Sequence, residues 1–124
     1  MAQTILDETF WAALDRLVAG AAVVIDRPKA SRHPRYPDLV YPLDYGYLAG
    51  TTAIDGGGVD IWVGSQAGRA VVGIVCTVDL VKADRELKIL LGCRPAEIEI
   101  VRQFHNSTSQ MKGAVLVRPA PGGL

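Results

Sequence analysis

The sequence has no excess of charge of either sign, because 13 lysines and arginines balance 13 aspartates and glutamates and the formal net charge is zero. Aromatic residues are also scarce, at 6% of the chain. Nucleic acids and anionic membrane surfaces attract proteins through excess positive charge, and single strands are also held by stacked aromatic rings. The composition therefore argues against a nucleic-acid partner and against a membrane partner.

Long hydrophobic runs and internal repeats are missing as well. No apolar run approaches the roughly 20 residues that a membrane-spanning helix needs. The lack of repeats and of low-complexity stretches argues against a solenoid or a disordered tail. A chain of 124 residues with 49% hydrophobic content instead fits one globular domain, over residues 1–124, with one core.

The chain has only two cysteines, Cys76 and Cys93, and both lie in apolar segments without the close spacing of a zinc site or a redox pair. We expect buried free thiols rather than a disulfide, which is typical of a reducing compartment. Residues 1–20 are too acidic and too amphipathic for a secretion signal. Together these features predict a cytoplasmic location.

The hydrophobic pattern predicts a helix, several strands, a second helix and a last strand. Apolar residues recur at helical spacing over residues 1–20, and Pro95 stands at the favoured first position of the second helix. Alternating or β-branched segments predict strands at 21–26, 59–65, 69–78, 86–93 and 113–119.

Strands outnumber the crossover segments that a parallel sheet would need. We therefore expect a mainly β (α+β) fold, a small closed OB-like barrel of five to six strands with flanking helices. Residues 1–20 would form the N-terminal helix, residues 21–118 the barrel with one inserted helix, and residues 119–124 a loose tail.

Four carboxylates fall at the ends of predicted strands or in turns, namely Asp55, Asp60, Asp84 and Glu86. Strands that begin or end at these points could bring the four together on one rim of a barrel. Mg²⁺ prefers such oxygen ligands and keeps sites open for water and substrate phosphate. The alternative is that these acids simply face water, as surface carboxylates usually do.

A basic stretch, RPKASRHPR from Arg27 to Arg35, is the natural complement to these acids. Lys29, Arg32 and Arg35, together with Lys88 on a later strand, could hold phosphate oxygens. The alternative is a solvated basic loop. In the same way, the tyrosines of YPLDYGY could aim a hydroxyl at a phosphate or fill the barrel interior.

Three segments in this order resemble the soluble inorganic pyrophosphatases of the magnesium-dependent, barrel-forming family: VVIDRPK, YPLDYGYLAGTTAIDGGGVDIWVGS and VVGIVCTVDLVKADRELKILLG. The resemblance covers about Val23 to Gly92 and extends more faintly to Val117. Its most specific part is YPxxYGY followed, eight residues later, by DGxxxD.

The resemblance implies roles for individual residues. Asp55 and Asp60 match the first and last acids of the family's metal motif, and Glu86 matches another metal-binding acid. Tyr45 and Lys88 match a tyrosine and a lysine that contact phosphate.

The same comparison assigns further residues with less exact matches. Asp84 is the counterpart of another metal-binding acid if its loop is shorter here, and Asp26 takes the place of a metal-binding glutamate on the first strand. Lys29 lies where the family supplies a basic group. Arg32 or Arg35 would replace an arginine of a hairpin that is collapsed in this chain.

Two departures stand out. Gly57 replaces the middle acid of the metal motif, which acts as the water-activating base in the family, and a late tyrosine–lysine pair has no counterpart. The chain thus resembles a shortened and divergent member. The resemblance implies Mg²⁺-dependent hydrolysis of inorganic pyrophosphate, a small-molecule substrate, slowly or with an altered substrate, with Asp60 or Asp55 accepting the proton.

The alternative is a non-catalytic module that binds a phosphorylated ligand on the same barrel. Because the family commonly assembles and this chain is small, we also expect a homo-oligomer.

Overall fold

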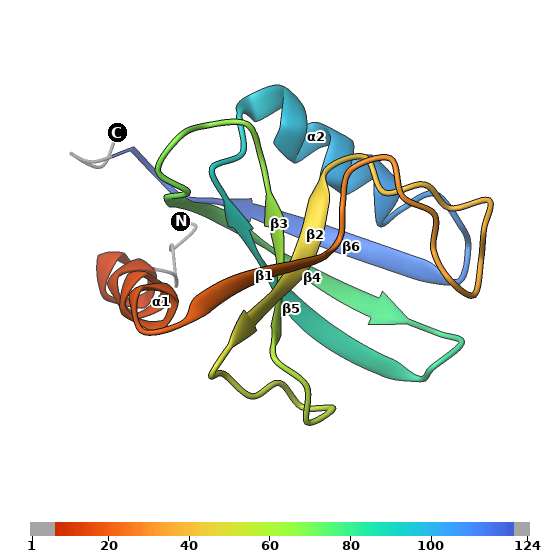
Figure 1. Cartoon of the computed structure of the whole chain (residues 1–124), viewed down its shortest axis with the longest axis horizontal. Coiled ribbons are helices and arrows are strands. Elements are labelled where there is room, and N and C mark those ends of the chain that lie inside the picture. The colour runs from red at the N-terminus through yellow and green to blue at the C-terminus, as the bar shows by residue number, and fades with distance from the viewer. Residues whose placement is uncertain (1–6, 121–124) are drawn as a thin grey trace, which may run out of the picture.

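The computed structural model describes residues 7–120, which form two helices and six strands (Figure 1). Their bounds are α1 Glu8–Ala19, β1 Ala22–Arg27, β2 Asp44–Ala49, β3 Val59–Val63, β4 Val71–Asp79, β5 Asp84–Leu91, α2 Pro95–Phe104 and β6 Met111–Val117. The predicted order of helix, strands, helix and strand is confirmed. Residues 1–6 of the predicted first helix and 121–124 of the predicted tail lie outside the described residues.

The six strands form one mixed sheet in the order β1-β2-β3-β5-β4-β6. β3 and β5 run parallel, and the other neighbouring pairs run antiparallel. The mainly β fold is therefore confirmed. The closed barrel is not confirmed, because within residues 7–120 β1 and β6 are the two edges of the sheet and no strand ladder joins them.

Helices pack against both faces of the sheet. Side chains of a strand point alternately to the two faces, and in β3 both faces are buried: Ile61 packs with Trp11 of α1, whereas Trp62 packs with Val101 of α2. β5 repeats this pattern, because Ile89 belongs to the first core and Leu90 to the second. A barrel strand would bury only one face against the interior.

The first helix is capped at its start and is tied by an ion pair to the residue that follows β6. Asp7 caps it, because its carboxylate accepts the backbone N–H groups of Thr9 and Phe10. Arg118, which follows β6, donates to both carboxylate oxygens of Asp15 at 2.7 and 3.0 Å. Neither helix of the described residues is long and apolar enough to cross a membrane.

A bulge and a close backbone approach shape the join between β1 and β2. Ile25 pairs with Gly46 and Arg27 pairs with Tyr45, so Asp26 is the extra residue of the bulge. At Gly46 a Cβ would lie 1.8 Å from the carbonyl oxygen of Val24. Only glycine fits there, and the resulting contact sets the position of the strand that carries Tyr45.

The two thiols differ in their surroundings. Both are free, Cys93 is buried as predicted, and Cys76 is exposed on β4. The prediction of a buried Cys76 was wrong because its side chain lies on a part of the sheet that neither helix covers, opposite the buried neighbours Val75 and Thr77.

Candidate functional site

A buried lysine forms the centre of the candidate site. Lys88 on β5 is only 4% exposed. Its ammonium donates to the Tyr45 hydroxyl at 2.9 Å, to Oδ2 of Asp60 at 2.9 Å and to Oε1 of Glu86 at 2.7 Å. An ammonium has three hydrogens, so these three contacts satisfy it completely.

The pairing of the strands explains why residues so distant in sequence converge. In the parallel pair of β3 and β5, Ile61 stands beside Ile89, which places Asp60 next to Lys88 on the opposite face. Glu86 is two residues before Lys88 and therefore shares that face. Tyr45 reaches the same point from β2, where it pairs with Trp62.

The surroundings keep Lys88 charged. Burial acts to lower its pKa, but the contacts with Tyr45, Asp60 and Glu86 outweigh burial, so the pKa is raised. Burial is the main reason why the pKa of the Tyr45 phenol is raised as well. At neutral pH the site therefore holds an ammonium and a neutral phenol. The side chains of Asp60 and Glu86 beside them are 28% and 23% exposed.

Behind this cluster lies a buried indole–imidazole pair. Trp62 donates its Nε1–H to Nε2 of His105 at 3.0 Å, and the Tyr45 ring packs on Trp62 at 4.7 Å between centroids. Burial and the charge of Lys88 lower the pKa of His105 to about 3, so this imidazole is neutral. Because Nε2 accepts, the proton is on Nδ1, which is buried without a partner.

Sequence reasoning had left the role of His105 open. One signal could have placed it: His105 lies four residues after the buried Val101, on the same side of α2. Arg27 was also missed as a candidate. The bulge turns it to the face of Tyr45, where its guanidinium donates to the Tyr41 hydroxyl.

The other predicted acids do not join the cluster around Lys88. Asp55 is exposed in the loop between β2 and β3, and its Oδ1 accepts the backbone N–H of Gly57. Asp26 is exposed at the bulge of β1. Asp84 begins β5 opposite Asp79 and is half-buried.

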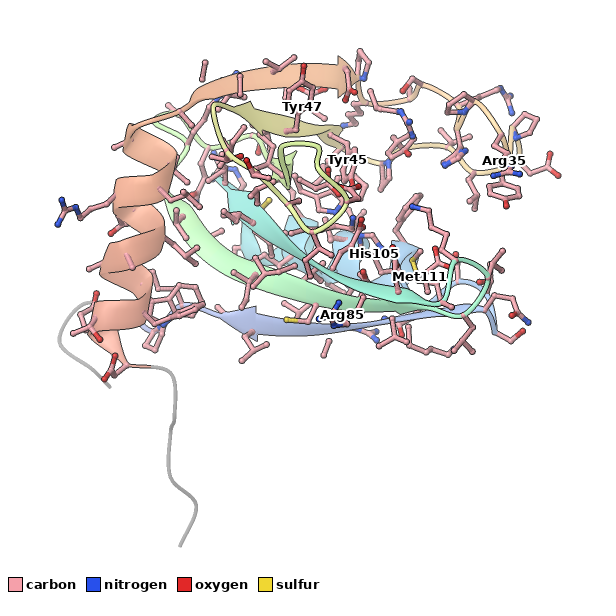
Figure 2. All side chains as sticks on the ribbon, turned by 90° about the horizontal axis from the view of Figure 1, so that it is seen from below. Arg35, Tyr45, Tyr47, Arg85, His105 and Met111 are labelled. Carbon is pink, nitrogen blue, oxygen red and sulfur yellow. The ribbon has the colours of Figure 1, made fainter. Side chains whose placement is uncertain are left out.

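The predicted phosphate-binding residues of the basic stretch also lie apart from Lys88. Lys29, Arg32 and Arg35 are exposed in the loop of residues 28–43, and Arg32 donates to the carbonyl oxygen of Pro37 at 2.9 Å. Figure 2 shows Arg35 at the outer end of this loop, while Tyr45 and His105 lie toward the middle of the molecule.

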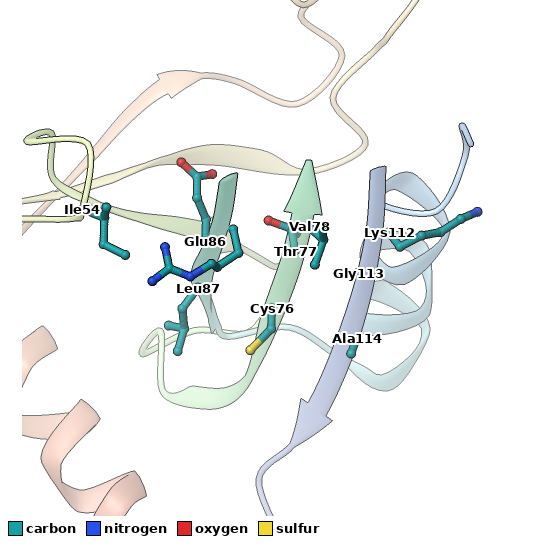
Figure 3. Close-up of a pocket in the computed structure, with 10 residues that line it drawn as sticks. Ile54, Cys76, Thr77, Val78, Glu86, Leu87, Lys112, Gly113 and Ala114 are labelled. Carbon is teal, nitrogen blue, oxygen red and sulfur yellow. The ribbon is translucent and has the colours of Figure 1, made fainter. Parts of the chain in front are cut away.

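A shallow groove of about 570 Å³ lies over the strands β4, β5 and β6 (Figure 3). Its lining is mostly apolar and includes Cys76, Val78, Leu87 and Ala114, with Ile54 at one side. These strand residues alternate with Thr77 and Glu86, so their side chains point to the face away from Lys88. The groove thus lies mainly on the opposite face from the charged cluster, although Glu86 also contributes to its lining.

The donor set limits what metal the site could hold. Among residues 7–120 no group of three or more histidine, cysteine, aspartate or glutamate side chains could hold a metal ion. Asp60 and Glu86, however, already converge on one cation, the ammonium of Lys88. Mg²⁺ is commonly bound by one or two carboxylates together with water and substrate phosphate, and these two acids fit that more modest role.

No protein-family model matches the sequence, and no curated protein sequence matches it either. The fold of this chain does resemble solved structures. The inorganic pyrophosphatase of Helicobacter pylori is 19% identical with a TM-score of 0.50, over 77% of this chain and 80% of that one. An inorganic phosphatase of Anaplasma phagocytophilum is 17% identical with a TM-score of 0.51, over 77% and 81%. At such identities the similarity concerns the fold, and the chain is similar in fold to inorganic pyrophosphatases.

Proposed function

We propose that this protein hydrolyses inorganic pyrophosphate to phosphate with the help of Mg²⁺. The observation that carries the proposal is the convergence of Tyr45, Asp60 and Glu86 on the ammonium of Lys88, in a fold similar to that of inorganic pyrophosphatases. The proposal agrees with the roles that the sequence motifs imply for these four residues.

In this proposal Asp60 and Glu86 hold the metal ion together with oxygens of the substrate. Mg²⁺, when bound, neutralises phosphate charge and makes a water more acidic. Asp60 is then the carboxylate available to accept a proton from the attacking water, because Asp55 lies in the exposed loop and is engaged by Gly57. Homo-oligomer formation and a cytoplasmic location stay predictions.

Lys88 serves as a fixed positive charge rather than as an acid or base. Its raised pKa keeps the proton on Nζ throughout the neutral range. When a carboxylate turns to the metal ion, an N–H of Lys88 becomes free to bind the leaving phosphate as negative charge develops on it. The Tyr45 hydroxyl accepts from Lys88 and keeps its own proton, so it can donate to a phosphate oxygen.

The glycine at position 57 makes slow turnover the expected behaviour. A general base typically contributes about 10²- to 10⁴-fold to a rate, and Gly57 places no carboxylate there. A Cβ at Gly57 would meet only the Asp55 carboxylate, at 3.4 Å or beyond. The space that the family fills with an acid is therefore open.

One observation favours a second candidate, a non-catalytic module that binds a phosphorylated ligand. Asp60 and Glu86 already have Lys88 as their cation. Among the described residues, no third acid joins these two to complete a metal site. In such a module the carboxylates would only orient Lys88, and a phosphate would bind to Lys88 and Tyr45.

The two candidates differ in whether phosphate is released. We expect wild-type protein at high concentration to release phosphate from pyrophosphate with Mg²⁺, and to stop when a chelator removes the metal. Saturable binding of pyrophosphate without any metal-dependent release would instead support the binding module.

A further inference from the structure

The loop of residues 28–43 carries aromatic side chains to which the proposed function assigns no role. A row of rings runs along it from the charged cluster outward. Tyr45, which accepts from Lys88, lies 5.3 Å from Tyr41 between ring centroids; Tyr41 lies 6.1 Å from His33, and His33 lies 5.1 Å from Tyr36.

The row passes from the interior to the surface. Tyr41 is 4% exposed, whereas Tyr36 at the outer end is 48% exposed. The rings of Tyr41 and His33 are nearly parallel, with 11° between their planes. Tyr36 therefore ends the row with a ring that has protein on one side and water on the other, and such a ring can stack on the flat face of a ligand.

The loop holds this arrangement in place. His33 and Tyr41 are tied across the loop, because His33 donates its backbone N–H to Leu39 and Tyr41 donates its own to Ser31. Nδ1 of His33 accepts the backbone N–H groups of Arg35 and Tyr36, at 3.0 and 3.1 Å. Four prolines in the loop restrict it further. Tyr36 is thus oriented before any ligand arrives, which reduces the entropic cost of binding.

Positive charge accompanies the row. The guanidinium of Arg27 lies 5.5 Å from the centre of the Tyr41 ring and donates to its hydroxyl. Burial lowers the pKa of His33, and the charges of Arg27, Lys82 and Arg35 lower it further. Lys82 belongs to the turn between β4 and β5, whereas Arg27 ends β1 and Arg35 lies in the loop. Cations from separate segments of the chain thus act on the same imidazole ring. Because Nδ1 of the neutral His33 accepts backbone hydrogen bonds, the ring proton is on Nε2. The Nε2–H group can then donate to a ligand.

We propose that the loop of residues 28–43 binds the planar ring of a pyrophosphate monoester that carries an aromatic base on its sugar, a nucleoside diphosphate, whose phosphates lie at Lys88. The inference rests on the proposed function for the position of the phosphates. Inorganic pyrophosphate carries no ring to stack on Tyr36, whereas a diphosphate joined to a ring through a sugar can extend from Lys88 toward the exposed end of the loop.

Calorimetric binding in the presence of Mg²⁺ tests this directly, with adenosine diphosphate, methyl diphosphate and inorganic pyrophosphate as the probes. Stacking of a base on an aromatic side chain contributes enough that we expect adenosine diphosphate to bind about fivefold or more tightly than methyl diphosphate. Tyr36→Leu should remove this preference and Tyr36→Phe should keep it. Both variants change an exposed side chain, and thermal unfolding checks that they are folded.

The outcomes separate the inference from the proposed function. Hydrolysis of pyrophosphate without any preference for the adenosine ester would overturn the inference and leave the function intact. A preference that Tyr36→Leu removes would support the ring site even if no phosphate were released. A preference that survives in Tyr36→Leu, or an affinity for oligonucleotides that rises with their length beyond that for adenosine diphosphate, would overturn the inference.

Discussion

The ammonium nitrogen of Lys88 on β5 lies 2.9 Å from Oδ2 of Asp60 on β3, although the two residues are 28 positions apart in the sequence. Glu86 binds the same ammonium, so two negative charges share one positive charge. In the proposed function, a divalent ion offsets this excess negative charge when pyrophosphate binds.

Replacing Lys88 by methionine should destabilise the fold by about 2–4 kcal/mol. Removing one partner of a buried ion pair typically costs about 3–5 kcal/mol, and the partial exposure of Asp60 and Glu86 reduces this cost. Because the two carboxylates then lack a cation, Mg²⁺ should stabilise the variant more than it stabilises the wild type. Urea unfolding with and without Mg²⁺ measures both effects.

Lys112→Met is the matched control for that experiment. Lys112 is a lysine on the neighbouring part of the sheet, in β6, and it is exposed. Its replacement should change the free energy of unfolding by no more than about 0.5 kcal/mol. Equal losses in the two variants would contradict the role assigned to Lys88.

The buried imidazole of His105 should make stability depend on pH. Its pKa falls from the ordinary 6.5 to about 3 in the folded chain. The unfolded chain therefore takes up a proton more readily, and the contribution of His105 is complete above pH 6.5 and lost as the pH falls toward 3. The slope should reach about 1.4 kcal/mol per pH unit within that range.

His105→Gln isolates this contribution, because a glutamine can accept from Trp62 but does not titrate. The free energy of unfolding of both proteins should be measured between neutral pH and pH 4.5, by urea titration at each pH. We expect the difference between them to shrink or reverse as the pH falls. A difference that stays constant would show that His105 is not held neutral.

Gly46→Ala should separate the two strands that position Tyr45. The added methyl group would lie 1.8 Å from the carbonyl oxygen of Val24, which is backbone and cannot turn away. We expect a loss of at least about 2 kcal/mol in the free energy of unfolding. Gly57→Ala is the control, since the nearest atom there is the Asp55 carboxylate at 3.4 Å, and similar unfolding midpoints for both variants would refute the steric explanation.

The residues around Lys88 were predicted from the family resemblance, and the regular period of the strands agrees with their placement. Glu86 and Lys88 alternate within one strand, and Asp60 begins another, so the two-residue period puts each on a definite face. The positions of the acids at strand ends and turns then suggested that they could meet on one rim of a barrel. What the sequence does not encode locally is the parallel pairing of β3 with β5, which places Asp60 beside Lys88.

Backbone irregularities and coverage by helices limit what the sequence can predict. The resemblance assigns Asp26 to the metal, and in the structure the bulge in β1 puts Arg27 opposite Tyr45 while Asp26 is exposed. A bulge arises from pairing with another strand and leaves no clear mark in a short segment. The exposure of Cys76 likewise follows from where the two helices end, which hydrophobic pattern alone does not fix.

Pyrophosphate hydrolysis by matched variants tests the central claim most directly, that Asp60, Glu86 and Lys88 form the working site. With Mg²⁺ present, we expect Asp60→Asn and Glu86→Gln each to lower kcat/KM for phosphate release by about 10²-fold or more. Glu99→Gln, which changes an exposed acid on α2, should leave it near the wild-type value. Wild-type turnover in Asp60→Asn, or no metal-dependent turnover in any of these proteins, would contradict the account.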